Sequence, residues 1–388
     1  MYDFDQIVDR RNTNCYKWDL YPNKLPMWVA DMDFAVCPEI YDALKDRLDK
    51  KVFGYNMIPD DWYETYISWW SRRHHFNIKK ESLLFSTGVV PTISSCVRAL
   101  TKRGDKVLIQ TPVYNIFFNS IINNGREVSE SPLVYQNGEY HIDFIDLENK
   151  LSQEDVTMMI LCNPHNPIGK IWDKETLSKI GELCYKHHVI VISDEIHCDI
   201  TKPGHEYIPF GSVNDICLNN SVICLAPTKV FNIAGLQTSA IVVNNQELYK
   251  KVYRAINNDE IAEPNSFAIQ AAVAAFNNGE QWANEMCEYV FANREMAKEF
   301  IAKELPTLHL VDGEATYLLW VDVSKICDDA TKLTDYLEEK ADLVVASGNK
   351  YGHSGEHFIR INVACPKALL MDGLNRLKNG VNSFIKGK

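Results

Sequence analysis

Short apolar runs recur through the middle of the chain and predict the strands of a single sheet. The five runs are KVLIQTP (106–112), TMMILCNP (157–164), VIVISDE (189–195), SVICLAP (221–227) and SAIVVN (239–244). Each is too continuous for a strand with one face in water, and segments of helical length separate most of them. The alternation predicts an α/β fold with a mostly parallel sheet between helices.

The two ends of the chain depart from this alternation and divide it into domains. Residues 1–45 are expected to form an irregular N-terminal arm that belongs to a small domain, and residues 46–285 the large domain. From about residue 290 a long helical pattern precedes two strand-like segments, YLLWVDV and HFIRINVA. This change predicts a C-terminal α+β part of the small domain over residues 286–388.

Composition and charge narrow the classes of function. The chain has 388 residues, 46% of them hydrophobic, which is enough for a substantial core. Its 52 acidic and 40 basic residues give a formal charge of -12, which disfavours nucleic-acid and membrane partners and favours a small-molecule ligand. The sequence begins without a signal-peptide pattern and has no long apolar span, so we expect a cytoplasmic protein. The 11 cysteines form no CxxC pair, and we assign no metal site.

Polar residues follow several of the predicted strands at their carboxyl ends. These residues are Thr111, Asn163, Asp194, Thr228 and Lys229. Ligands of parallel α/β sheets bind outside the carboxyl ends of the strands, so we expect the five side chains to share one crevice.

Lys229 is the candidate reactive group of this crevice. It lies in LAPTKVFNIAGL (225–236), where Phe231, Ile233 and Leu236 can desolvate it and lower its pKa from about 10.4. A neutral amine can attack an aldehyde, so Schiff-base chemistry becomes available. The alternative is an ordinary solvated lysine in a loop.

Three separated motifs resemble one enzyme family. NPHNPIG (163–169), SDEIH (193–197) and APTKVFNIAGL (226–236), with FIRINVA near the end, are similar to the fold-type I pyridoxal phosphate enzymes of the class I/II aminotransferase group. Within that group, PMWVADMDF, SDEIHCD and the glutamine of GLQTS resemble the branch of cystathionine β-lyases and related carbon–sulfur lyases, the MalY/PatB type. The resemblance implies pyridoxal 5'-phosphate as cofactor.

The resemblance also implies roles for the residues around the cofactor ring. Lys229 would bind the cofactor covalently, Asp194 would pair with the pyridinium nitrogen, and Asn163 would contact the phenolic oxygen. Tyr114 would stack on the ring. The alternatives are a helix N-cap for Asp194, a structural turn for Asn163, and core packing for Tyr114.

The phosphate would be held by main-chain amides of Gly88 and Val89 at the start of a helix, together with Thr228. Tyr55 would reach the phosphate of a neighbouring subunit, which implies a homodimer; core packing is the alternative for Tyr55. This chain has Gln237 where most of the group has a phosphate-binding arginine. It also has His197 at the usual position of a tyrosine, and this histidine is expected near the ring oxygen.

Two further residues are expected to bind the substrate. Arg360 lies in an apolar strand pattern and needs an anion, for which an amino acid's α-carboxylate is the expected partner and a structural ion pair the alternative. We hypothesise that the arm carrying Trp28 covers the distal, sulfur-bearing end of the substrate.

Together these features predict β-elimination on a sulfur amino acid, with cystathionine converted to homocysteine, pyruvate and ammonia, and with cysteine and S-conjugates as other candidate substrates. An aminotransferase is one alternative. The other is a cofactor-binding regulator that acts through protein contacts and has incidental lyase activity.

Overall fold

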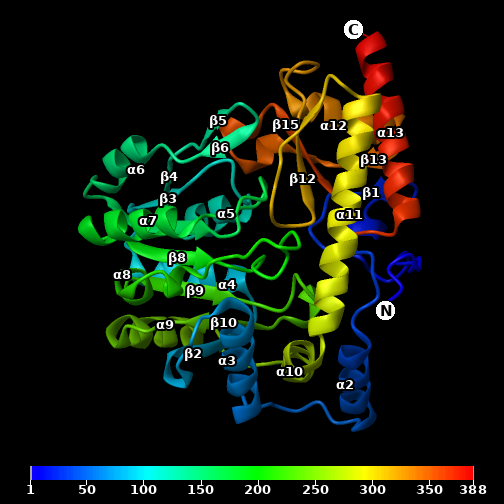
Figure 1. The fold of residues 1–388 in the computed structure, drawn as a ribbon. Helices are drawn as coiled ribbons and strands as arrows, with labels where there is room; N and C mark the ends of the chain where they lie inside the picture. Colours follow the sequence, from blue (N-terminus) through cyan, green and yellow to red (C-terminus); the bar gives the residue numbers. More distant parts are fainter. Residues whose placement is uncertain (1, 388) are drawn as a thin grey trace.

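The computed structural model describes residues 2–387, and its two main sheets differ in character (Figure 1). The larger sheet has seven strands. In spatial order they are β2 (Leu83–Ser86), β10 (Ser239–Val242), β9 (Ser221–Leu225), β8 (Ile190–Asp194), β7 (Val156–Cys162), β3 (Lys106–Ile109) and β4 (Glu127–Glu130). All five predicted runs are strands of this sheet, so the predicted α/β class is confirmed.

The large sheet is mixed at one side because β10 runs antiparallel to both of its neighbours, β2 and β9. The pairs from β9 through β8, β7 and β3 to β4 are parallel. Parallel strands buried on both faces need apolar side chains on both faces, which explains their continuous hydrophobic runs. β4 lies at the edge and is only partly buried, and its sequence EVSE lacks that signal.

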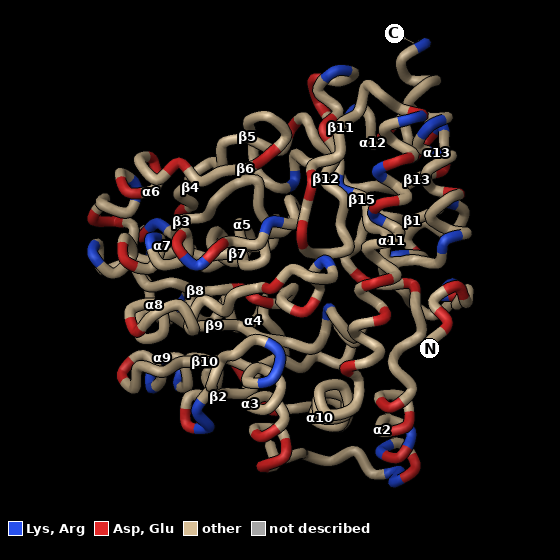
Figure 2. Tube along the Cα trace, viewed as in Figure 1, with Lys and Arg blue, Asp and Glu red and all other residues tan. Residues whose placement is uncertain are grey.

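Helices cover both faces of this sheet. One face packs against α4 (Val89–Leu100), α5 (Ile116–Ile122) and α9 (Gln246–Asn258). The other face packs against α6 (Phe144–Leu151), α7 (Lys174–Lys186) and α8 (Asp215–Asn219). A third group, α2 (Pro38–Asp49), α3 (Asp60–His74) and α10 (Ala268–Asn278), packs beside β2 and β10. Charged residues lie mainly on the helices and loops around the sheet (Figure 2).

The small domain is built on a four-stranded antiparallel sheet. Its strands, in spatial order, are β11 (His309–Leu310), β12 (Leu318–Asp322), β15 (Phe358–Asn362) and β14 (Ala346–Ser347). The helices α12 (Ala330–Lys340) and α13 (Lys367–Lys386) pack on it. A separate hairpin joins β5 (Val134–Gln136) to β6 (Glu139–His141).

The N-terminal arm joins the small domain by strand pairing. After the short helix α1 (Tyr16–Asp19), β1 (Leu25–Pro26) runs parallel to β13 (Leu343–Val344). The arm then crosses toward the large sheet, so that residues near 30 lie between the two domains.

The predicted domain limits fall inside two helices. The division between residues 45 and 46 lies within α2, and that between 285 and 286 lies within α11 (Glu280–Glu304). Trp282 and Met286 of α11 belong to the apolar cluster that contains Phe231, whereas Ala297 and Ile301 belong to the cluster that packs on the four-stranded sheet. This continuous helix therefore links the two cores (Figure 1). Among the described residues, none of the helices combines the length and the apolar character needed to cross a bilayer.

Candidate active site

A cavity of about 260 Å³ lies at the carboxyl ends of β8 and β9, where the sheet, the arm and α4 meet. Most of the residues predicted for the site line it. Those lining residues are Gly88, Val89, Tyr114, Asp194, His197, Thr228 and Lys229. The predicted Tyr55, Asn163, Arg360 and Trp28 are not part of this lining, nor is Thr111.

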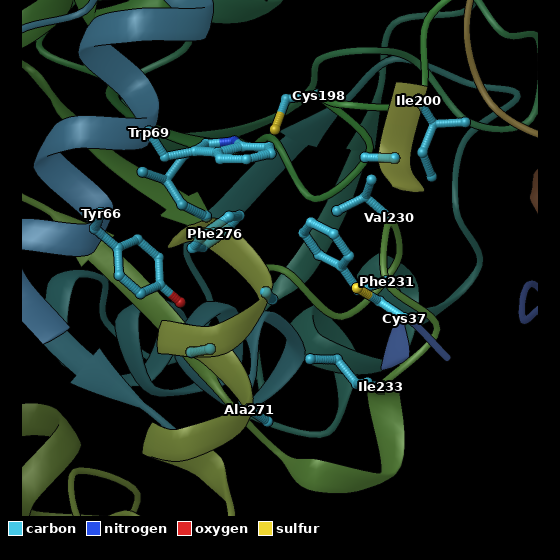
Figure 3. Close-up of a cluster of buried hydrophobic side chains, with 14 of the residues drawn as sticks. Cys37, Tyr66, Trp69, Cys198, Ile200, Val230, Phe231, Ile233, Ala271 and Phe276 are labelled. Carbon is cyan, nitrogen blue, oxygen red and sulfur yellow. The ribbon is translucent and has the colours of Figure 1, made fainter. Parts of the chain in front are cut away.

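Lys229 is fixed by the residues that follow it. Phe231 is fully buried, and its ring centroid lies 5.9 Å from those of both Trp69 and Phe276. Figure 3 shows Val230 and Phe231 in this cluster of apolar side chains. The turn after β9 therefore has its apolar side anchored in the core while Lys229 faces the cavity.

The environment of the Lys229 amine makes its neutral form more accessible than in an ordinary lysine. Nζ donates a hydrogen bond to the main-chain oxygen of Ala30 at 2.5 Å. Burial lowers the pKa of Lys229 to about 8; Asp31 opposes this effect and Arg360 adds to it. The expected desolvation is thus present, and the amine is a better nucleophile and base than an ordinary lysine.

Asp194 ends β8 and is buried at the cavity wall. Its Oδ1 accepts a hydrogen bond from the main-chain N–H of Ile196 at 3.1 Å. Burial raises the pKa of Asp194 to about 6, against the influence of Lys229. Within residues 2–387 no lysine or arginine forms an ion pair with this carboxylate. A buried carboxylate without an ion-pair partner can accept a hydrogen bond from the protonated ring nitrogen of a ligand.

The turn after β7 places the second asparagine of NPHNPIG, not the first, at the cavity. The Nδ2 of Asn163 donates to the carbonyl of Ile208 at 2.9 Å, and Asn163 is not a lining residue. Asn166 lines the cavity, and its Oδ1 accepts from Arg360. Because the motif repeats Asn-Pro, residue type alone could not tell which asparagine faces a ligand. The geometry favours Asn166 for the contact that we predicted for Asn163.

Arg360 is a buried cation on β15, in the interior of the small sheet. Its Nη1 donates to Asn166 Oδ1 at 3.1 Å and its Nη2 to the carbonyl of Trp28 at 2.9 Å. The guanidinium lies over the ring of Tyr351, 4.9 Å from its centroid. No carboxylate of the described chain pairs with it, and its Nε has no hydrogen-bond partner there. The structural ion pair that was the alternative is therefore absent from residues 2–387, which favours an external carboxylate.

His197 and Tyr114 present neutral polar groups to the cavity. Burial, with Lys229 and Arg360 adding to it, holds the pKa of His197 well below its usual value. The Nδ1 atom of His197 is buried without a partner among the described residues. Burial raises the pKa of Tyr114 to about 12, so its phenol stays protonated. Both side chains can donate or accept a hydrogen bond without carrying charge.

The start of α4 forms the other part of the cavity. Val89 is the first residue of this helix and Gly88 its N-cap, so N–H groups of the first turn have no helical carbonyl to bind. Thr228 is buried beside them. Gln237 lines the cavity from an exposed position in the left-handed region, with φ 52°. Among the described residues that line the cavity, the basic side chains are Lys229 and His197.

Trp28 and Tyr55 are placed differently from the other predicted residues. The ring of Trp28 packs against the rings of Tyr16 and Tyr21, with centroids 5.3 and 5.8 Å away. Its link to the site is its main-chain carbonyl, which Arg360 binds. Tyr55 lies between α2 and α3 and is 100% exposed in this single chain.

One cluster of potential metal ligands lies outside the cavity, among residues of the core. His74, Cys198 and Asp199 have ligand-type atoms within 4.8 Å of one another. The oxygens of Asp199 already accept hydrogen bonds from Trp69, Arg73 and His74. The cluster is thus a satisfied hydrogen-bond network.

Comparison with known proteins agrees with this fold. Residues 22–377 match the model of the family described as aminotransferase class I and II, and the chain belongs to this family of pyridoxal phosphate enzymes. The chain is 41% identical to cystathionine beta-lyase PatB of Bacillus subtilis (strain 168), with 97% of this chain and 99% of PatB covered. It is 30% identical to protein MalY of Escherichia coli (strain K12), over 99% of this chain and 100% of MalY.

A solved structure extends the similarity to three dimensions. Cystalysin from Treponema denticola, which contains pyridoxal 5'-phosphate, superposes with a TM-score of 0.96. The sequence identity is 31%, and 99% of each chain is covered. The predicted family and its MalY/PatB branch are confirmed by these comparisons.

Proposed function

We propose that this chain is a pyridoxal phosphate-dependent carbon–sulfur lyase that carries out β-elimination on sulfur amino acids. Cystathionine is the expected substrate; with one water it gives homocysteine, pyruvate and ammonia. The observation that carries the proposal is the Lys229 amine, held at the cavity wall with a pKa lowered to about 8. The 41% identity to PatB over nearly the whole chain supports the lyase branch.

The cavity has the donors and acceptors that pyridoxal phosphate needs. Asp194 provides a buried acceptor for the ring nitrogen, and Asn166 and His197 provide polar groups for the ring oxygen. Amides at the start of α4 and the hydroxyl of Thr228 suit the phosphate. When bound, the cofactor withdraws electrons from the substrate α-carbon, which makes the α-proton acidic and allows a β-substituent to leave.

The side chains of this protein then bind the substrate and move the proton. Arg360 can present two N–H groups in a planar fork to the α-carboxylate, replacing its present bonds to Asn166 and the Trp28 carbonyl. The amine of Lys229, which lies at the cavity wall, would remove the α-proton as general base. The electron pair left behind expels the thiolate from the β-carbon.

The segment between α2 and α3 supports a homodimeric enzyme. It carries a row of exposed apolar side chains, namely Val52, Phe53, Tyr55 and Met57, with exposed fractions of 69%, 52%, 100% and 77%. Such a row favours a second copy of the chain as its cover. We propose that Tyr55 reaches the partner's phosphate site. Sedimentation at low concentration tests the proposed dimer, because a fully active monomer would contradict it.

All eleven cysteines are free thiols, which supports a reducing, cytoplasmic location for this reaction.

The decisive experiment separates the lyase from an aminotransferase. The purified holoenzyme is incubated with cystathionine in the absence of any keto acid, and pyruvate and free thiol are measured. We expect both products in equal amounts. Product formation that requires an added keto acid would replace the lyase proposal with an aminotransferase.

A further inference from the structure

One main-chain oxygen of the arm receives two side-chain donors from the active site. The carbonyl of Ala30 accepts a hydrogen bond from Lys229 Nζ at 2.5 Å and another from the hydroxyl of Tyr317 at 3.0 Å. Ala30 also lines the cavity, so this oxygen lies beside the space where the reaction takes place. The catalytic amine thus shares its acceptor with a tyrosine that no motif indicated.

The position of this oxygen is fixed from both sides. Asn362 Nδ2 donates to the carbonyls of Val29 and Asp31, at 2.6 Å each, and these residues flank Ala30. The next residue, Met32, donates its N–H to Asn232 Oδ1 at 3.0 Å. The arm therefore holds the Ala30 carbonyl rigidly against the turn that carries Lys229.

Tyr317 is a buried, neutral hydrogen-bond donor. It is fully buried, and burial raises the pKa of its phenol well above the usual value. Its own main-chain oxygen accepts from the N–H of Val363 at 2.9 Å, which ties it to the neighbouring strand. Its hydroxyl hydrogen is therefore directed at the Ala30 oxygen.

We propose that the Ala30 carbonyl is the docking position of the Lys229 amine whenever that amine is not bound to the cofactor, and that Tyr317 is a positioning residue that holds this carbonyl and shares it. The inference deepens the proposed function, because it rests on Lys229 as the base. Its test includes a measurement that requires neither cofactor nor reaction.

The arrangement has a consequence for the proton-transfer step. The C–H bond at the α-carbon breaks, an N–H bond forms on Lys229, and the electron pair stays with the substrate carbon. The new ammonium group can donate to the Ala30 oxygen. Because the hydroxyl of Tyr317 uses the same oxygen, the ammonium is stabilised less than it would be by a free carbonyl, and the amine stays a base of moderate strength.

Several other charged or titratable groups act on this amine from the surrounding elements. They are Asp31 on the arm, Asp194 on β8, His197 after β8 and Arg360 on β15. The substitution Tyr317→Phe leaves all of them in place and removes a single hydroxyl group. Tyr66→Phe is the matched control, because Tyr66 is equally buried and lies in the core cluster outside the cavity lining.

The first measurement determines the pKa of Lys229 in the cofactor-free protein, from the pH dependence of its acetylation by acetic anhydride, followed by peptide mass spectrometry. We expect Tyr317→Phe to raise this pKa by about half a unit, because the ammonium gains the whole acceptor. Asn362→Ser should lower the pKa of Lys229, because the Ala30 carbonyl is no longer held in place. An unchanged pKa in both variants, or an equal shift in Tyr66→Phe, would overturn the proposal.

The second measurement follows exchange of the α-proton of alanine with solvent deuterium by the holoenzymes, which requires no leaving group. Tyr317→Phe should slow exchange several-fold, shift the acidic limb of its pH profile upward, and leave the KM for alanine within about twofold. A variant that only melts at lower temperature, with unchanged exchange and unchanged amine pKa, would assign Tyr317 a packing role and refute the inference.

Discussion

Two buried ionic clusters lie close together in this molecule and differ in their pairing. In the arm, Lys17 and Arg10 bind Asp33 at 2.7 Å each, and Arg10 binds Asp31 at 2.6 Å. The indole of Trp18 adds a hydrogen bond to Asp33 at 2.8 Å. At the cavity, by contrast, the lining residues Lys229 and Asp194 and the nearby Arg360 form no ion pair within the described chain.

The pKa values of the buried groups therefore shift in opposite directions in the two clusters. In the arm, attraction to Asp33 and Asp31 outweighs burial and raises the pKa of Lys17, while Lys17 lowers the pKa of Asp33 against the effect of burial. In the cavity, burial dominates, so the pKa of Lys229 falls to about 8 and that of Asp194 rises to about 6. The charges of a paired cluster satisfy one another, whereas those of an unpaired cluster are available to a cofactor and a substrate.

The largest effect is expected from removing the amine of the unpaired cluster. Lys229→Ala should abolish turnover and the visible absorption of the lysine-bound cofactor, with the fold intact. Activity and absorption spectra of the purified variant measure this, with the exposed Lys102→Ala as control. Cofactor that borohydride still attaches to a different lysine would contradict the assignment.

Removing a charge from the paired cluster should instead lower the free energy of unfolding. Asp33→Asn leaves Lys17 buried without its main partner and should lower the free energy of unfolding by about 3–5 kcal/mol. Urea unfolding of the cofactor-free protein measures the loss. The control is Asp9→Asn at the exposed pair with Arg11, which should cost less than about 1 kcal/mol. Equal, small losses in both variants would show that the arm cluster contributes little.

Asp194→Asn should change stability in the opposite direction. Because the folded pKa of about 6 lies above the ordinary value of 3.8, the charged carboxylate destabilises the cofactor-free fold above that pH range. The variant should be more stable than wild type by roughly 2–3 kcal/mol at neutral pH and equal to it below about pH 4. It should also lose most turnover.

Asp33 has the reverse pH dependence. Its lowered folded pKa means that its stabilising contribution is complete above the unfolded pKa and is lost as the pH falls through the folded one. Urea unfolding at several pH values distinguishes the two carboxylates. A destabilised Asp194→Asn at neutral pH would contradict the contrast between the clusters.

The smallest effect concerns Arg360, the arginine that we propose binds the substrate. Arg360→Lys should reduce kcat/KM for every α-amino acid alike by about 10- to 150-fold, because a point charge replaces a fork. Arg294→Lys is the matched control, since Arg294 is also buried but donates to the carbonyls of Thr316, Leu318 and Gly313. The control should lose stability and keep kcat/KM. Losses in kcat/KM that depend on the substrate's side chain would show that Arg360 does not bind the α-carboxylate.

The strands and the position of Lys229 at the cavity were predictable because their signals are local. Strands buried on both faces require continuous apolar runs, and Lys229 stands alone among apolar neighbours. Asn163 and Asn166 were not separable, since the same dipeptide occurs twice and only the path of the turn decides which side chain faces the cavity. The roles of the Trp28 and Ala30 carbonyls had no signal, because every residue has a main-chain oxygen.

The continuity of α11 between the two cores has a mechanical consequence. Its 25 residues correspond to a rod about 37 Å long, with one end set in the core that holds Lys229's turn and the other in the core beneath Arg360's sheet. A rod of that length converts a tilt of about 5° at one end into a displacement of about 3 Å at the other. That displacement is comparable to one hydrogen-bond length. The orientation of this helix therefore fixes how the strand that carries Arg360 is placed relative to the turn that carries Lys229.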